Sequence, residues 1–201
     1  MADWNKRYQE TDQRLFGANP NEYVREVMAR SDTGINSALM IADGDGRNGA
    51  WLASLGVHVT AVDISNVATE QAREHDKKLG VTVARITADL ETWTPDPAQT
   101  FDAAFMIYLQ CENNVRRRAA GIAAAALNEH GWFAAEGFAL GDDGSGELGP
   151  GKDDLLYDRE SLLSALPDFR IVEALSGQIF LDEGVKHRGT GWVFRLLARK
   201  P

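Results

Sequence analysis

The chain has 201 residues, of which 44% are hydrophobic and 25% are charged. These values are typical of a folded globular protein and exclude an intrinsically disordered chain, which would carry fewer apolar residues. The net charge of -9 disfavours nucleic acid as a partner, because a polyanion is repelled unless a local basic cluster overrides that charge. The single cysteine, Cys111, excludes an intrachain disulfide and a cysteine-based zinc cluster, and no metal motif stands out.

The sequence has one dense basic run, at residues 116–118, within a stretch of helical pattern. We interpret this run as the charged surface of a helix rather than a phosphate site. Residues 1–10 contain no apolar run, which indicates neither a secretory signal nor a membrane anchor. We therefore expect a cytoplasmic protein, monomer or homodimer, without a membrane or nucleic-acid partner.

Two short helices are predicted first, over residues 4–8 and 21–29, and together residues 1–30 form a predicted helical cap over a ligand crevice. Short apolar runs rich in Val, Ile, Ala and Phe then alternate with longer helical patterns. The predicted strands are 38–42, 57–62, 81–87, 101–108 and 132–136, and the predicted helices are 47–55, 67–79 and 112–128. This alternation is typical of βα units around a parallel sheet and predicts a doubly wound α/β core.

The pattern changes after the fifth predicted strand. Residues 141–151 are rich in Gly and Asp and have no periodicity, so residues 139–157 are a candidate lid loop, either functional or simply disordered. A short helix is predicted over 158–166, with Asp158 or a neighbouring residue as its N-cap. Two β-like runs, 171–181 and 192–198, are predicted to pair antiparallel across the polar segment 182–190. We expect residues 1–201 to form a single domain.

The strongest local signal is a glycine-rich turn between the first strand and the next helix. Gly44, Gly46 and Gly49 match the pattern G-x-G-x-x-G, and Asp63 follows at the end of the next strand. Turns of this kind bind nucleotides in α/β sheets, because glycine lets the backbone approach the ligand closely. The pattern alone is compatible with NAD, with S-adenosylmethionine (SAM) and with a turn that binds nothing.

The charge of the turn favours SAM over NAD. Asp43 and Asp45 lie where a dinucleotide would place its pyrophosphate, and like charges at that distance cost several kcal/mol by order of magnitude. SAM has no phosphate and carries a sulfonium and an ammonium group, so an acidic turn suits it. At the next strand ends, Asp63 is expected to bind the ribose hydroxyls. Asp89 and Leu90 are expected to contact adenine, although Asp89 is also a common type of turn or cap residue.

At these residues the chain resembles the class I SAM-dependent methyltransferases, in particular the small single-domain group related to tellurite-resistance and thiopurine methyltransferases. The matching segments are 4–8, 16–17, 19–21, 43–48, 61–65, 88–90, 101–103, 131–133, 136–138, 181–184 and 187–189. The resemblance implies a Rossmann-like seven-stranded sheet of order 3-2-1-4-5-7-6 with the seventh strand antiparallel. The residues expected to contact SAM are Phe16, Ala42, Asp43, Gly44, Gly46, Arg47, Asn48, Asp63, Ile64, Ala88, Asp89, Leu90 and Ile107.

The first strand departs from the family pattern. The family ends this strand in Asp-x-Gly, whereas this chain has Met40 and Ala42 at those positions. The missing aspartate would help to organise the loop or meet the ammonium group of the ligand. Asp43 is a candidate to replace it.

Residues after the fourth and fifth strands are candidates for the acceptor side of the site. They are Tyr108, Gln110, Cys111, Glu112 and Phe138. The resemblance also places a His-Arg pair, here His187 and Arg188, near the transferred methyl group. Arg188 would hold an anionic acceptor and neutral His187 would take a proton, unless this polar segment is only a solvated turn. A sulfur, selenium or tellurium acceptor would need no strong base, whereas oxygen or nitrogen would.

The sequence thus predicts an enzyme that transfers a methyl group from SAM to a small-molecule acceptor, with Tyr108, His187 and Arg188 as candidate catalytic residues. Two alternatives remain open. One is an NAD(P)-linked oxidoreductase that uses the glycine-rich turn. The other is a protein that binds SAM without catalysis.

Overall fold

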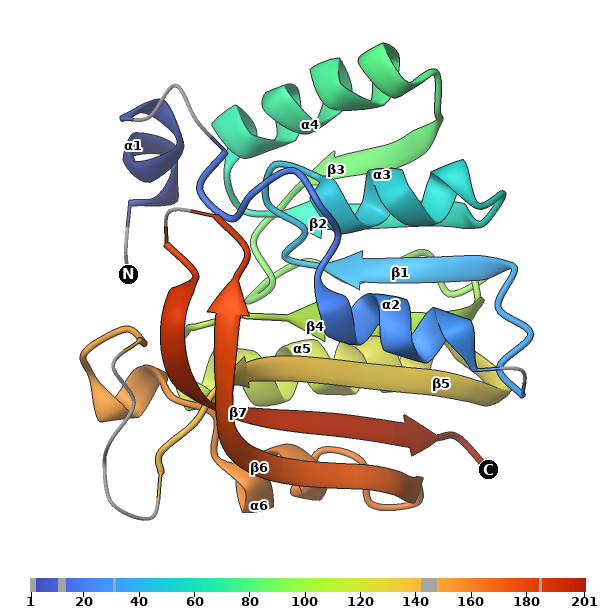
Figure 1. Ribbon diagram of the computed structural model, residues 1–201. Helices are drawn as coiled ribbons and strands as arrows, with labels where there is room; N and C mark the ends of the chain where they lie inside the picture. The colour runs from blue at the N-terminus through green and yellow to red at the C-terminus, as the bar shows by residue number, and fades with distance from the viewer. Residues whose placement is uncertain (1–2, 11–13, 31, 142–147, 185) are drawn as a thin grey trace.

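A computed structural model of the chain describes residues 3–10, 14–30, 32–141, 148–184 and 186–201. A seven-stranded sheet of order β3-β2-β1-β4-β5-β7-β6 runs through the molecule (Figure 1). The strands are β1 (Ser37–Ile41), β2 (His58–Asp63), β3 (Val83–Thr87), β4 (Phe101–Ile107), β5 (Leu127–Phe138), β6 (Arg170–Asp182) and β7 (Arg188–Arg199). β1 to β5 run parallel to one another, and β7 pairs antiparallel with β5 and β6. The predicted fold class and strand order are confirmed.

Helices cover both faces of the sheet. They are α1 (Trp4–Gln9), α2 (Glu22–Ala29), α3 (Arg47–Ser54), α4 (Asn66–Leu79), α5 (Asn113–Ala126) and α6 (Arg159–Ser164), with a 3-10 turn η1 at Asp153–Leu155. α2 and α3 pack on one face, and α5 and α6 pack on the other. α1 lies beside α4, at the edge of the sheet where the parallel strands end (Figure 1).

Strand β4 shows why the central strands read as continuous apolar runs. Ala103, Phe105 and Ile107 pack into the core under α2 and α3, whereas Ala104 and Met106 pack into the core under α5 and α6. Successive side chains point to opposite faces of a strand, so a strand covered on both sides needs apolar residues at every position. The sheet therefore presents polar groups to a ligand only at the strand ends.

Local capping residues fix the ends of the helices. Ser65 caps α4, because its side chain accepts a hydrogen bond from the Ala68 N–H, and Gly80 ends the same helix with φ 69°. Asp158 caps α6 by accepting from the Ser161 N–H, which confirms its predicted role. The loop between β2 and α4 is thereby held rigidly next to Asp63.

The β6–β7 hairpin is longer than the sequence predicts. The polar segment 182–190 was expected to separate two β runs, yet Asp182 pairs with Arg188 and Leu181 pairs with Gly189 in the ladder. Backbone pairing continues there because exposed strand ends need no apolar side chains. Only residues 183–187 are left for the turn, which places His187 directly beside the last ladder pair.

The described part of the predicted lid is anchored to the core. Residues 142–147, the centre of the candidate lid 139–157, lie outside the described residues. Beyond them, the Tyr157 N–H donates to the Phe138 carbonyl at 2.7 Å, and the Tyr157 side chain is buried. The predicted cap 1–30 is divided in the structure: α1 packs on α4 and α2 packs on the sheet.

The prediction that residues 116–118 form a charged helix surface is wrong for Arg116. Arg116 is only 1% exposed, and its guanidinium donates to carbonyl groups of Leu109, Cys111, Leu155 and Leu156. A helical pattern fixes which face a residue occupies, but it does not reveal that loop carbonyls converge on that face. Arg116 therefore connects the loop after β4 to residues 155–156 through hydrogen bonds.

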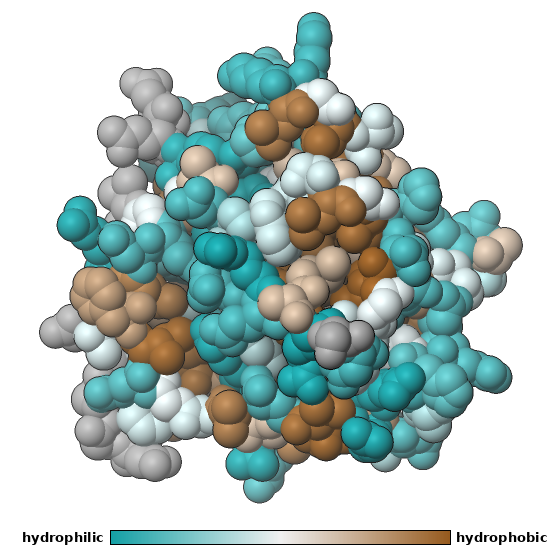
Figure 2. Space-filling view, turned by 45° about the vertical axis from the view of Figure 1, so that its right-hand side comes forward, coloured by the Kyte–Doolittle hydropathy of each residue, from teal (hydrophilic) through white to brown (hydrophobic). Residues whose placement is uncertain are grey.

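On the face shown in Figure 2, hydrophobic residues form separate patches among hydrophilic ones. Within the part of the chain that the structure describes, no helix is long and apolar enough to cross a membrane.

Candidate functional site

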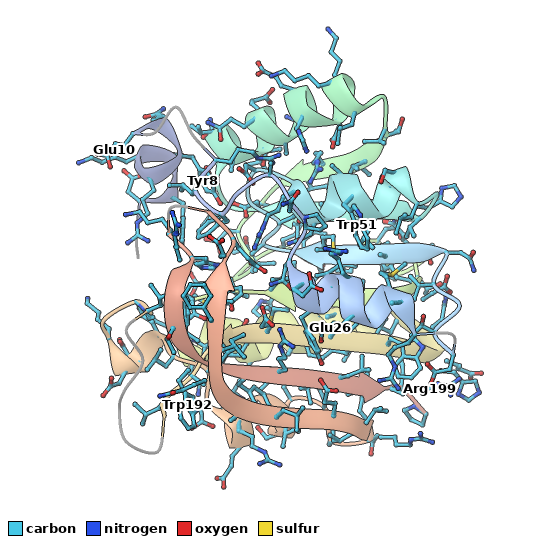
Figure 3. The ribbon with its side chains drawn as sticks, viewed as in Figure 1. Tyr8, Glu10, Glu26, Trp51, Trp192 and Arg199 are labelled. Atoms are coloured by element: carbon cyan, nitrogen blue, oxygen red, sulfur yellow. The ribbon has the colours of Figure 1, made fainter. Side chains whose placement is uncertain are left out.

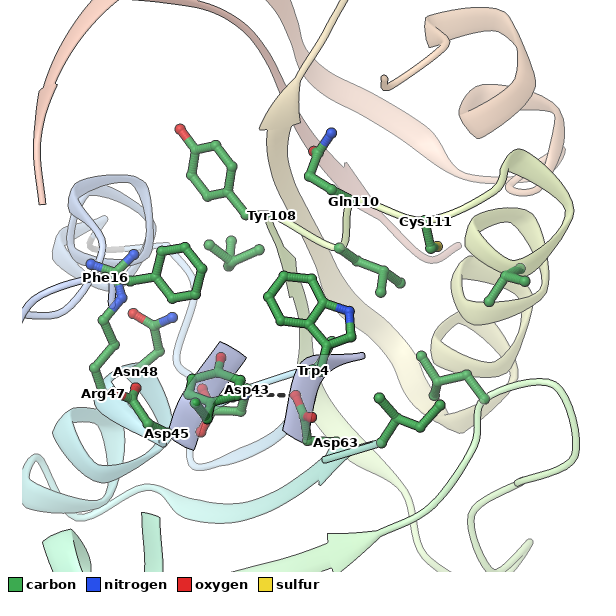
Figure 4. A pocket seen from close by; sticks show the side chains of 18 of the residues that line it. Trp4, Phe16, Asp43, Asp45, Arg47, Asn48, Asp63, Tyr108, Gln110 and Cys111 are labelled. Carbon is green, nitrogen blue, oxygen red and sulfur yellow. Dashed lines mark hydrogen bonds between the residues drawn. The ribbon is translucent and has the colours of Figure 1, made fainter. Parts of the chain in front are cut away.

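A cavity lies at the carboxyl ends of β1, β2 and β4, under α1 and the β6–β7 turn. Figure 4 shows Asp43, Asp45 and Asp63 on one side of it, Tyr108, Gln110 and Cys111 on the other, and Trp4 between them. The complete lining is Trp4, Tyr8, Phe16, Ala42, Asp43, Gly44, Asp45, Arg47, Asn48, Asp63, Ile64, Asp89, Leu90, Ile107, Tyr108, Leu109, Gln110, Cys111, Val115 and His187. Of the predicted cofactor contacts, the cavity brings together all except Gly46 and Ala88, and of the candidate catalytic residues all except Arg188.

The glycine-rich turn forms the floor of this cavity. Gly44 and Gly46 have φ values of 57° and 87°, in the left-handed region that favours glycine. A Cβ atom on Gly44 would overlap the hydroxyl of Tyr8, so glycine is also required by the close approach of α1. Ala42 has φ 56° at the position where the family carries glycine. An alanine in this left-handed conformation carries local strain that a glycine would not.

Helix α1 covers the turn and is tied to α4. Asn5 Oδ1 accepts a hydrogen bond from the Ser65 hydroxyl at 2.7 Å, and Gln71 donates to the Tyr8 carbonyl at 3.1 Å. Figure 3 shows Tyr8 turned inward from α1, whereas Glu10 points away. Because Trp4 and Tyr8 both line the cavity, α1 excludes water from the cofactor half of the site.

The two acids of the turn are already paired with arginines. Asp43 contacts the Arg85 guanidinium at 2.5 Å and accepts from the Gly49 N–H at 3.2 Å. Asp45 contacts Arg14 Nε at 2.9 Å. The expectation that the turn presents net negative charge to the ligand is therefore wrong, because Arg14 and Arg85, distant in sequence, neutralise it. Asp43 does organise the loop in place of the missing strand aspartate, but its carboxylate is buried.

Asp63 stands at the end of β2 with both carboxylate oxygens held by the backbone. Oδ2 accepts from the Gly44 N–H and Oδ1 from the Ser65 N–H, each at 2.8 Å. Burial raises the pKa of Asp63 to about 6, and the carboxylates of Asp43 and Asp45 add to this effect while the two N–H donors oppose it. Each oxygen keeps one lone pair for a further donor, which suits a pair of ribose hydroxyls.

The residues after β3 and β4 form an apolar slot next to Asp63. Leu90 is buried, and Ile64 and Ile107 line the same part of the cavity. Asp89 lines it as well, and its side chain also accepts from the Glu91 N–H at 2.9 Å, as expected of a turn residue. Ala88 does not line the cavity; its N–H donates to the Asp63 carbonyl at 2.9 Å. An aromatic base fits between apolar walls of this kind.

Aromatic rings enclose the opposite half of the cavity. The ring of His187 lies 4.7 Å from that of Phe16, 4.3 Å from that of Tyr108 and 5.2 Å from that of Phe138, between centroids. His187 is 4% exposed, and burial lowers the pKa of its imidazole, so the ring is neutral near neutral pH. The predicted place of His187 at the acceptor side is consistent with this geometry.

Tyr108 has an unusual backbone for a bulky residue. Its φ is 52°, and its N–H donates to the Glu136 carbonyl at 2.6 Å. The buried Tyr108 hydroxyl has no hydrogen-bond partner among the described residues. Left-handed conformations of large side chains cost about 1–3 kcal/mol and concentrate at functional sites. A free hydroxyl beside His187 is therefore a candidate contact for the acceptor.

The other acceptor-side candidates differ in position. Gln110 is fixed, because it donates to the Leu155 carbonyl at 2.8 Å and accepts from the Phe138 N–H at 3.0 Å. Cys111 lines the cavity, but burial raises the pKa of its thiol to about 11, which leaves little thiolate for nucleophilic attack. Glu112 is exposed and precedes α5 without lining the cavity.

The structure places Arg188 outside the cavity. Its side chain is 75% exposed and lies 3.6 Å from Asp182 across the hairpin. His187 is the last residue of the turn and faces the cavity, whereas Arg188 begins β7 with its side chain in solvent beside Asp182. The geometry does not support a role for Arg188 in holding an anionic acceptor.

Sequence reasoning missed a buried polar network behind the acceptor side. Asn21 donates to Glu136 at 2.6 Å and to Glu183 at 3.1 Å, Arg195 donates to Glu136 at 2.6 Å, and Arg47 donates to Glu183 at 2.8 Å. Glu136 is fully buried in β5. A charged residue inside a predicted buried strand was the one available signal, because such a charge requires a partner.

Comparisons with known proteins relate the chain to methyltransferases. Residues 38–131 match the family described as methyltransferase domain. The fold is similar to that of TehB from Haemophilus influenzae, at 17% identity and TM-score 0.73, over 90% of this chain and 62% of TehB. It is also similar to magnesium protoporphyrin IX methyltransferase (ChlM) from Synechocystis PCC 6803 with bound S-adenosylhomocysteine, at 15% identity and TM-score 0.66, over 90% and 80%. The chain therefore has the fold of these solved structures, and residues 38–131 match a methyltransferase domain.

The fold alone does not identify the reaction, because a protein described as a cyclase shares it. The [4+2]-cyclase SpnF has TM-score 0.70 and 17% identity, over 98% of this chain and 90% of that chain. No curated protein matches the chain by sequence. Because the chain spans 62% of TehB, and because one fold can serve several reactions, activity has to be argued from the site.

SAM, the predicted cofactor, fits the residues present. The turn lets the backbone approach a ligand at Gly44, Asp63 offers acceptors to two hydroxyls, and Leu90 offers an apolar face. The prediction of SAM as cofactor is confirmed by the methyltransferase-domain match and by the similar ChlM structures solved with SAM or S-adenosylhomocysteine, although the electrostatic reason for it is wrong.

Proposed function

We propose that the chain transfers a methyl group from SAM to a small-molecule acceptor inside this cavity. The observation that supports the proposal most directly is that one enclosed cavity joins the strand-end residues suited to SAM, such as Asp63 and Leu90, to Tyr108 and His187 on the opposite side. A site that holds donor and acceptor together can supply most of the rate by proximity and by exclusion of water.

The cofactor half would hold SAM through residues of three strand ends. Asp63 would bind the ribose hydroxyls, Asp89 and Leu90 the adenine, and the turn from Asp43 to Asn48 the amino-acid portion, with Tyr8 closing over it. When bound, SAM supplies an electrophilic methyl group and leaves as S-adenosylhomocysteine.

The acceptor half would take a small neutral molecule with an apolar body. Phe16, Leu109 and Val115 give it apolar walls, and the Tyr108 hydroxyl and the His187 imidazole are its available polar groups. Arg47, the cation among the described lining residues on this side, is held by Glu183. Neutral His187 can take the proton that an acceptor atom releases as it gains the methyl group. A soft acceptor would need His187 only for orientation.

Isothermal titration calorimetry with SAM, S-adenosylhomocysteine and NAD tests the cofactor. We expect the first two to bind and NAD not to bind; binding of NAD alone would replace the proposal with an oxidoreductase. An acceptor screen that follows formation of S-adenosylhomocysteine, with small thiols, selenols, phenols and amines as probes, tests transfer. Tight binding of SAM with no turnover of any probe would favour a SAM-binding protein without methyl transfer.

A further inference from the structure

The tip of the β6–β7 hairpin carries a carboxylate next to His187. Glu183 Oε2 lies 3.8 Å from His187 Nδ1, slightly beyond hydrogen-bond distance, and the side chains of Glu183 and His187 are 13% and 5% exposed. His187 Nδ1 is buried and has no hydrogen-bond partner among the described residues, so Glu183 needs to approach by only a small shift to accept its proton. The backbone of the turn fixes this spacing, because the Glu183 N–H donates to the His187 carbonyl at 2.8 Å and the His187 N–H donates to the Gly184 carbonyl at 3.1 Å. The two side chains therefore face each other across a tight turn.

Glu183 is itself held by donors from two other elements. Oε1 accepts from Asn21 Nδ2 and from the Glu22 N–H, each at 3.1 Å, and Oε2 accepts from Arg47 at 2.8 Å. Burial would raise the pKa of Glu183, but His187, Arg47 and the Glu22 N–H outweigh burial and lower it to about 2. Glu183 is consequently an anion near neutral pH.

His187 meets few other charged groups. Phe16 faces it from the N-terminal segment, Tyr108 from the end of β4 and Phe138 from β5, all through their rings. The charged groups that act on its imidazole are Glu183 on its own hairpin and Arg47 at the start of α3; Glu183 raises its pKa while burial and Arg47 lower it. Glu183 is thus the acceptor that its Nδ1 side faces.

We propose that Glu183 is a positioning residue for His187: it accepts the Nδ1–H of the neutral imidazole and so leaves Nε2 as the unprotonated nitrogen toward the cavity. A neutral imidazole carries one proton, and the partner of one nitrogen decides which nitrogen remains an acceptor. Glu183 also binds Arg47, which directly follows the glycine-rich turn, so the same carboxylate would fix the position of His187 relative to that turn. This inference builds on the proposed acceptor role of His187, but its first test needs no acceptor.

The tautomer of His187 can be read by NMR on protein labelled with ¹⁵N-histidine. The chain has four histidines, and a His187→Gln variant assigns the resonances of interest. In the wild-type protein near neutral pH we expect His187 to be neutral with its proton on Nδ1. A neutral His187 with its proton on Nε2 would overturn the proposal without any variant.

A pair of charge-removing variants on the same hairpin gives the second test. In Glu183→Gln we expect the Nε2–H tautomer to gain population and the pKa of His187 to fall, because the anion that raises it is gone while Arg47 remains. Asp182→Asn is the matched control: it removes an adjacent, exposed carboxylate that pairs with Arg188, and we expect it to leave His187 unchanged. Equal effects of the two variants, or no change in His187 in Glu183→Gln, would refute the positioning role.

Two further measurements separate the possible failures. Should Glu183→Gln not fold, Glu183→Asp keeps the charge but withdraws it by one methylene, and we expect a smaller gain of the Nε2–H tautomer; an unchanged tautomer would refute the proposal. Titration of the wild-type protein with S-adenosylhomocysteine tests the proposed function by itself. Absent binding would remove the methyltransferase proposal while leaving the tautomer result intact.

Discussion

The contact that Asp63 makes with the ribose can be tested by Asp63→Asn, which keeps the shape of the side chain and removes its charge. In the structure both carboxylate oxygens accept a backbone N–H, from Gly44 and Ser65, and both would also face ribose hydroxyls. Loss of hydrogen bonds to a charged group costs about 1.5–3 kcal/mol. We therefore expect affinity for S-adenosylhomocysteine to fall roughly tenfold to a hundredfold.

The substitution also affects folding, and the assay has to separate the two effects. An amide has one acceptor oxygen, so either the Gly44 or the Ser65 N–H would face the new NH₂ group, at a cost of about 1–3 kcal/mol. Removing a buried charge next to Asp43 and Asp45 offsets part of this cost. Calorimetric titration should be run well below the Tm of the variant, with the exposed neighbour Glu91→Gln as control. A folded Asp63→Asn variant with the wild-type Kd would refute the assignment.

The pH dependence gives an independent check on the same residue. Because the pKa of Asp63 is raised to about 6, its carboxylate takes up a proton as the pH falls through that value. Affinity for S-adenosylhomocysteine should then weaken below about pH 6, and Asp63→Asn should lose this dependence. Stability should change in the opposite sense: an acid with a raised pKa in the folded state contributes stability below its unfolded pKa and loses it as the pH rises through about 6.

Three other substitutions test separate parts of the site. Arg85→Gln should lower the free energy of unfolding in urea by about 3–5 kcal/mol, because it leaves the buried Asp43 and Asp76 carboxylates unpaired; a loss below about 1 kcal/mol would contradict this. Ala42→Gly should raise stability by up to about 1 kcal/mol, since glycine relieves the strain at φ 56°, and an unchanged or lower Tm would argue against strain there. With an acceptor identified by the screen, His187→Ala should lower turnover at saturating SAM, whereas Arg188→Ala should keep wild-type turnover. An equal loss of turnover in the two variants would show that Arg188 does contribute to the reaction.

The fold could be predicted from the sequence because its signals are local. The apolar run of β1, the glycine turn at Gly44 and Gly46, and the Asp158 cap each act within a few residues of the chain. The strand order was predicted from the family resemblance, because hydrophobic periodicity identifies strands but does not give their order in a sheet. The length of the hairpin strands was underestimated, because Arg188 and Gly189 pair through their backbones and neither has an apolar side chain that would indicate a strand.

The electrostatics of the site could not be predicted in the same way. The sequence shows Asp43 and Asp45 in the turn, but the arginines that neutralise them come from positions 14 and 85, on other elements. Pairing of this kind depends on which side chains the fold brings together, and no local pattern reports it. Arg116 illustrates the same point, because the run 116–118 conceals one buried member that binds loop carbonyls.

The buried pairs also decide which groups remain free for chemistry. Asp43, Asp45, Arg47 and Glu183 are all charged and all lie at or next to the cavity, yet each is held by another side chain of the protein. The polar atoms without a hydrogen-bond partner among the described residues on the acceptor side are the Tyr108 hydroxyl and His187 Nδ1, and this nitrogen lies 3.8 Å from Glu183. A cavity whose fixed charges are neutralised internally attracts ions weakly and favours a neutral acceptor, because a charged one would lose its hydration without a free counter-charge to replace it. Selectivity for the acceptor is therefore expected to follow shape and hydrogen bonding at Tyr108 and His187 more than net charge.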